Sequence, residues 1–146
     1  MVSFRYHSKR NIKEIEAPQI GTKGTELDLL IRQGATFGPI PATLKNPDTS
    51  PVDLTGATIR AQVRKTPTSA IGEGCSATFV LTNPAQGAFT WEFPASATQT
   101  LAADSESELA AASTYVWDME VELANGRVIP LLYGKVNVFR EVTKAV

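Results

Sequence analysis

The strongest structural signal in the sequence is the alternating segment from Tyr115 to Leu123. Large apolar side chains at every second position alternate there with mainly acidic ones. A period of two predicts a half-buried β-strand, because successive side chains of a strand point to opposite faces. Asn125-Gly126 follows, and residues 127–138 resume an extended pattern. Asn-Gly between two such runs predicts a β-hairpin closed by a two-residue type I′ turn, in which both residues have positive φ.

Shorter segments of the same kind, separated by turn residues, precede this hairpin. We expect strands over residues 26–32, 37–45, 58–64, 77–82 and 88–93, with the last two joined as a hairpin through residues 83–87. Pro39 and Pro41 cannot donate to a β-ladder, so the second strand is expected to border its sheet or to be interrupted there. Residues 95–109 favour a short helix or a solvated loop. About seven strands with little helix predict an all-β fold, an immunoglobulin-like antiparallel β-sandwich.

The apolar faces of the expected strands predict one shared core. Its members are Ile59, Val63, Trp91, Trp117, Met119, Val121 and Val136. The opposite faces carry charge, with Asp118, Glu120 and Glu122 on one strand and Arg60 and Arg64 on another. If those strands are neighbours, the two rows form cross-strand ion pairs. Recognition of a partner is the alternative role of these charges.

Residues 1–24 have a different character from the rest of the chain. They are basic, and they show neither helical periodicity nor sustained alternation. Pro18, Gly21 and Gly24 suit an extended linker better than a packed element. We therefore expect an extended N-terminal arm over residues 1–24 and a β-sandwich domain over residues 25–146.

The arm combines apolar and basic side chains, which suits docking against another protein. The expected partner-binding residues are Phe4, Arg5, Tyr6, Lys9, Arg10, Ile12, Lys13 and Ile15. A segment that becomes ordered on binding can cover a large surface from a small domain. A loose terminus with incidental apolar residues and an arm that contacts nucleic acid are the alternatives.

The residue types available for catalysis or metal binding are few. His7 is the only histidine and lies in the arm, so a Ser-His-Asp or Cys-His arrangement would need its base there. Cys75 is the only cysteine, which rules out an internal disulfide and a cysteine-built zinc site. We expect no enzyme activity and no cofactor. Asp104, Glu106 and Glu108 lack the spacing of a calcium loop, so a solvated acidic loop is expected, with a cation site as the alternative.

Charge and hydropathy argue against a membrane or nucleic-acid partner. The formal net charge of -1 gives no overall attraction to nucleic acid or to an anionic membrane. No apolar run approaches the roughly 20 residues that a spanning helix needs, and residues 1–10 lack the apolar region of a signal peptide.

Several short motifs follow one another in a distinctive order along the chain. Val52-Asp53-Leu54-Thr55-Gly56 precedes the strand that ends in Arg64-Lys65. Tyr115-Val116-Trp117-Asp118 opens the strand that turns at Asn125-Gly126, and Gly134-Lys135-Val136 lies in the last strand. This order resembles that of small tail and baseplate structural proteins of tailed bacteriophages. In those proteins a "DLTG" segment precedes a strand ending in a basic pair, and a "Y-x-W/Y-D" strand turns into a final "L-x-G-x-V" strand. The similarity covers residues 26–143 and excludes the basic arm and the insertion at 102–113.

The resemblance implies a non-enzymatic virion protein, made in the bacterial host cytoplasm and carried in many copies in a symmetric assembly. Its place would be the tail or baseplate, where it acts as an adaptor that docks tail, baseplate or fibre proteins. A head decoration or head-tail connector protein is the alternative within the virion. A carbohydrate-binding, receptor-recognition module with Trp91 or Tyr133 as a stacking platform is the alternative of another class.

Overall fold

The computed structural model describes residues 4–5, 14–16, 24–67, 74–101 and 113–140. The strands are β1 (Phe4–Arg5), β2 (Glu14–Glu16), β3 (Thr25–Arg32), β4 (Phe37–Lys45), β5 (Thr58–Arg64), β6 (Cys75–Ser76), β7 (Thr78–Asn83), β8 (Ala88–Phe93), β9 (Ser113–Glu122) and β10 (Val128–Phe139). A 3-10 turn, η2 (Pro84–Gln86), and a one-turn helix, α1 (Ala95–Thr98), complete the described elements. The expected all-β class is confirmed.

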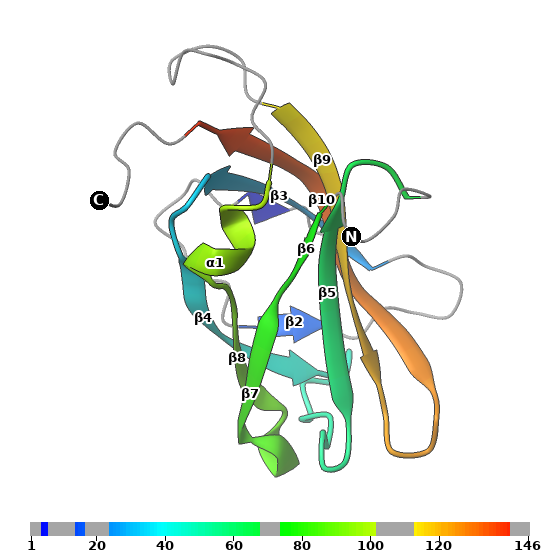
Figure 1. Ribbon diagram of the computed structural model, residues 1–146. Helices are drawn as coiled ribbons and strands as arrows, with labels where there is room; N and C mark the ends of the chain where they lie inside the picture. The colour runs from blue at the N-terminus through cyan, green and yellow to red at the C-terminus, as the bar shows by residue number, and fades with distance from the viewer. Residues whose placement is uncertain (1–3, 6–13, 17–23, 68–73, 102–112, 141–146) are drawn as a thin grey trace.

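Two sheets pack face to face to form a β-sandwich (Figure 1). The six-stranded sheet has the order β1-β3-β10-β9-β5-β6, and the four-stranded sheet has the order β2-β4-β8-β7. The runs β10-β9-β5 and β4-β8-β7 have the same order as strands G-F-C and B-E-D of the immunoglobulin fold. The chain passes from one sheet to the other between β6 and β7, where Ala77 N donates to Ala61 O at 2.9 Å.

The sheets are mixed, so the expectation of a purely antiparallel sandwich is corrected. β1 and β10 both pair with β3 in parallel, and β2 pairs with β4 in parallel. β3 and β10 lie near opposite ends of the described chain. Parallel neighbours need a long crossover connection, so no local turn in the sequence announces such a pair.

The β9–β10 hairpin is confirmed, but its turn differs from the expected type I′. Gly126 N donates to Leu123 O at 2.8 Å, and Leu123 N donates to Arg127 O at 2.8 Å, which closes a three-residue loop. Gly126 has a φ of 88°. Asn125 lacks the positive φ that a type I′ turn needs, because Thr49 is the only non-glycine residue with positive φ in the described ranges. Asn125 Oδ1 instead accepts a hydrogen bond from Arg127 N at 2.9 Å. Loops of three residues commonly end in such a left-handed glycine.

The pairing of β4 is interrupted at the first of its two prolines, which is one of the two predicted outcomes. The β4–β8 register shifts between Phe37 and Ile40, which brackets Pro39. On the other side of β4, the described part of β2 covers only residues 43–45. A proline has no N–H to donate, and the ladder is broken around Pro39, whereas Pro41 keeps its place opposite Thr90 of β8.

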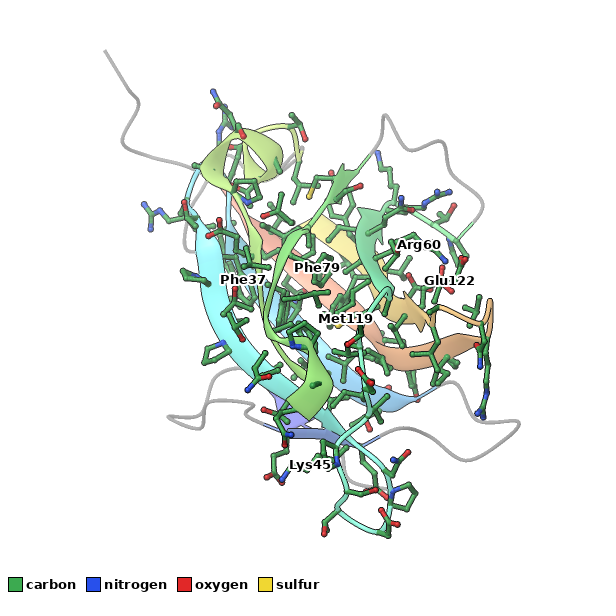
Figure 2. The ribbon with its side chains drawn as sticks, turned by 90° about the horizontal axis from the view of Figure 1, so that it is seen from below. Phe37, Lys45, Arg60, Phe79, Met119 and Glu122 are labelled. Carbon is green, nitrogen blue, oxygen red and sulfur yellow. The ribbon has the colours of Figure 1, made fainter. Side chains whose placement is uncertain are left out.

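The core fills the space between the sheets, and every residue predicted for it is buried in one cluster. At its centre Trp91 of β8 stacks on Trp117 of β9, with ring centroids 5.6 Å apart and an interplanar angle of 15°. Phe93 meets Trp91 edge-on at 6.1 Å. In Figure 2 the side chains of Phe37, Phe79 and Met119 lie between the sheets, whereas Arg60 and Glu122 lie outside them.

Trp117 also ties β9 to β3 across the intervening strand. Its Nε1 donates to Leu27 O at 2.7 Å, and the bond is buried. Gly134 of β10 pairs with Trp117, and a Cβ on Gly134 would lie 2.1 Å from Leu27 O. One residue further, Lys135 N donates to Asp28 Oδ1 at 2.9 Å. Side chains therefore supply bonds where the β3–β10 ladder is interrupted, and only glycine leaves room for the close approach.

Trp117→Ala is expected to lower the free energy of unfolding by about 3 to 5 kcal/mol, because it removes a buried aromatic side chain and leaves a cavity. Trp117→Phe keeps an aromatic ring but removes the donor to Leu27 O, which is expected to cost about 1 to 3 kcal/mol. Urea unfolding followed by circular dichroism measures both.

The control is Thr114→Ala, an exposed position on the same strand, with an expected change of about 0.5 kcal/mol or less. A Trp117→Ala protein that melts within about 2 °C of the wild type would contradict the central role of this residue.

Candidate functional site

The outer face of the six-stranded sheet carries the predicted charged rows. β5 pairs with β9 so that Arg60 lies opposite Glu120. Arg60 Nε lies 3.3 Å from Glu120 Oε1, and Arg60 Nη2 lies 3.2 Å from Glu122 Oε1. The predicted cross-strand ion pairs are thus confirmed for Arg60. Hydrogen bonds to Glu122 and then to Glu120 raise the pKa of Arg60 above its usual value.

Further along the same face, Asp118 lies opposite Gln62 of β5 and Tyr133 of β10. Partial desolvation, followed by repulsion from Glu120, raises the pKa of Asp118, and attraction to Arg64 opposes the shift. Arg64 itself donates to Gln62 Oε1 from Nη2 at 2.9 Å and from Nε at 3.2 Å. These groups form a mixed-charge surface that can meet a complementary surface of another protein.

The "DLTG" motif forms the turn that leads into β5. Thr55 N donates to Asp53 Oδ1 at 2.9 Å, and Ala57 N donates to Leu54 O at 2.9 Å. Hydrogen bonds from the side chain of Thr55 and then from its backbone N–H lower the pKa of Asp53. Leu54 is fully buried, and Gly56 has a φ of 76°, which suits glycine. The residues of this motif therefore have a structural role, which is to form the turn before β5.

The structure places only part of the expected partner-binding arm. The backbone of Phe4 and Arg5 forms β1 beside β3, and Glu14–Glu16 forms β2 beside β4. The boundary at residue 25 had implied that residues 1–24 lie outside the sandwich. Both of these strands, however, belong to its sheets.

Ile15 was expected to contact a partner, and this expectation is corrected. Its side chain is 2% exposed and belongs to the core of its own chain. Its neighbours Glu14 and Glu16 point outward, which is the alternation that the strand imposes. Tyr6, Lys9, Arg10, Ile12 and Lys13 lie outside the described residues, so their role stays a prediction.

The structure describes some of the other candidate residues and not others. Trp91 is buried in the core, so it cannot act as a stacking platform for a sugar. Tyr133 is half-buried on the outer face of the six-stranded sheet. His7 and the acidic residues Asp104, Glu106 and Glu108 lie outside the described residues.

One feature of the surface was missed by the sequence reasoning: the edge strand β7. Val80 of this strand is 60% exposed, and its neighbours Thr78 and Thr82 are exposed as well. The segment Thr78–Asn83 contains no charged residue, which the sequence already displays. Its position at a sheet edge, however, depends on non-local pairing.

Comparison of the sequence with protein-family models finds no matching family, and comparison with curated proteins finds no match. Across the described residues, no helix is long and apolar enough to span a membrane. Nor do the described His, Cys, Asp and Glu side chains form a group of three placed to hold a metal ion. Fold and surface together define an all-β sandwich domain with immunoglobulin-like strand order.

Ile15→Ala is expected to lower the free energy of unfolding by about 2 to 5 kcal/mol, because it opens a cavity under the β2–β4 pair. Glu14→Ala is the control. The Glu14 side chain is 68% exposed and lies 3.4 Å from Lys45 Nζ, so its loss should cost about 1 kcal/mol or less. Equal denaturation midpoints for the two variants would contradict the packing of residues 14–16 against the sandwich.

Cys75 is expected to resist thiol reagents in the folded protein. Burial raises its pKa to about 12, so at pH 8 the thiolate is about a thousandfold scarcer than for a thiol with a pKa of 9. Reaction with Ellman's reagent should be slow in buffer and fast in denaturant. Because the folded pKa is the higher one, this burial stabilises the fold below about pH 9, and the contribution is lost towards pH 12. Rapid labelling of the native protein would contradict this account.

Proposed function

We propose that the chain is a structural virion protein of a tailed phage, a tail or baseplate adaptor that docks neighbouring virion proteins and catalyses no reaction. The observation that carries the proposal is the ordered set of motifs around Asp53–Gly56, Tyr115–Asp118 and Gly134–Val136. Each motif alone is ordinary turn or strand chemistry. Their common order is what resembles the phage proteins.

The positions of these motifs in space support reading them as one set. A Cβ on Gly56 of the first motif would lie 3.1 Å from Ala124 Cβ, in the loop that joins β9 to β10. Trp117 of the second motif pairs with Gly134 of the third and reaches Leu27 past it. The first motif therefore meets the loop of the hairpin that carries the other two, and this common scaffold favours a shared fold over a chance series of turn residues.

The docking role is assigned to the basic and apolar residues between β1 and β2. β1 joins the six-stranded sheet and β2 joins the four-stranded sheet, so both ends of this stretch are fixed to the domain. Tyr6, Lys9, Arg10, Ile12 and Lys13 of this stretch, together with Phe4 and Arg5 of β1, remain the proposed contacts, and Ile15 is withdrawn from them. Anchored ends lower the entropy that a binding segment loses on ordering.

Replacing Lys9, Arg10 and Lys13 together by serine is expected to abolish incorporation into particles while shifting the melting temperature by about 2 °C or less. The variant is supplied in trans to a phage that lacks the native gene, and purified particles are analysed by mass spectrometry. The wild-type chain should be present at a fixed copy number.

The matched control replaces Lys65, Arg127 and Arg140 by serine, which removes the same charge from exposed positions outside the arm. This control should incorporate normally. Normal incorporation of the arm variant would refute the docking role. A wild-type chain missing from purified particles would refute the virion assignment, and immunogold label on the head would favour the decoration or connector role.

A further inference from the structure

Among the described strands, β7 is the longest that stands at the end of a sheet. The four-stranded sheet ends at β7, which pairs with β8 on one side only. The other three terminal strands are short: β1 and β6 have two residues each, and β2 has three, whereas β7 has six. An edge strand presents unpaired N–H and C=O groups, which another extended chain can pair with.

β7 lacks the side chains that usually protect an edge. Its sequence, Thr-Phe-Val-Leu-Thr-Asn, contains neither a charged residue nor a proline. Val80, 60% exposed, stands in the middle of the strand. The register with β8 shifts only between Leu81 and Asn83, so Thr78 to Leu81 remain regular. Lysine, proline and bulges are the devices that discourage strand addition, and here only the bulge is present, at one end.

The sequence of β7 is nearly symmetric about Val80, so the strand can pair with a second copy of itself. In an antiparallel pair centred there, Val80 meets Val80, Phe79 meets Leu81 and Thr78 meets Thr82. Each pairing is favourable across strands, and no like charges meet. We propose that β7 is a homodimerisation edge that pairs antiparallel with β7 of a second copy, with the two-fold axis at Val80.

The symmetry of this contact limits its size. An isologous pair uses the same edge of both copies, so it closes as a dimer and does not continue into a fibre. The contact joins two four-stranded sheets into one continuous sheet. Because one strand from each side forms a small interface, the dimer is expected to be weak and dependent on concentration. The inference does not rest on the proposed virion function.

Sedimentation velocity on the full chain tests the proposal, over about 10 to 500 µM, a range suited to weak affinity. The wild type should shift from monomer towards dimer, and Val80→Lys should remain monomeric at every concentration with an unchanged melting temperature. Val128→Lys is the control, because Val128 is 46% exposed and lies on β10 in the other sheet. It should dimerise as the wild type does.

A cross-linking experiment tests the position of the axis. Residues directly opposite in an antiparallel pair have Cβ atoms about 4.5 to 5.5 Å apart, close enough for a disulfide after a small adjustment. Under mild oxidation Val80→Cys should form a covalent dimer, while Val128→Cys should stay monomeric and Cys75 should stay buried. A wild type that is monomeric throughout, a Val80→Lys variant that dimerises, or equal cross-linking at positions 80 and 128 would each overturn the proposal.

Discussion

The indole of Trp117 is the contact on which the rest of the sandwich depends. Its face stacks on Trp91 and joins the two sheets, while its N–H bonds to Leu27 O and fixes β3 beside β10. Antibody domains join the same two sheets with a disulfide, which a chain with one cysteine cannot form. Here aromatic packing and one buried hydrogen bond take that place. Gly134 makes the arrangement possible, because any side chain there would collide with the Leu27 carbonyl.

A core held in this way leaves the outer surfaces free to differ from each other. The six-stranded sheet presents the mixed charges of Arg60, Asp118 and Glu120, whose exposed pairs contribute little to stability. The four-stranded sheet ends in the uncharged edge β7. Both surfaces suit contacts with other proteins. The proposed adaptor role and the proposed dimer edge thus use different parts of one rigid scaffold.

The errors of the sequence reading have a common physical origin. Ile15 stands alone between two glutamates, so its strand is too short to show any periodicity. Its burial depends on the pairing with β4, which places the strand over the core. The parallel pairing of β3 with β10 likewise joins residues that no turn connects. At Asn125-Gly126 the local signal correctly predicted the hairpin. The hydrogen bond from Leu123 N to Arg127 O, however, makes the loop three residues long instead of two.

The sequence by itself determined the all-β class, the main strands and the buried residues. Alternation with a period of two encodes which side of a strand is apolar, and that property is local. The tertiary structure alone decided which strands are neighbours, which part of residues 1–24 is packed, and which edge is left open. Those properties depend on pairing between distant segments, and its free energy comes from burial and hydrogen bonds that exist only once the sheets have met.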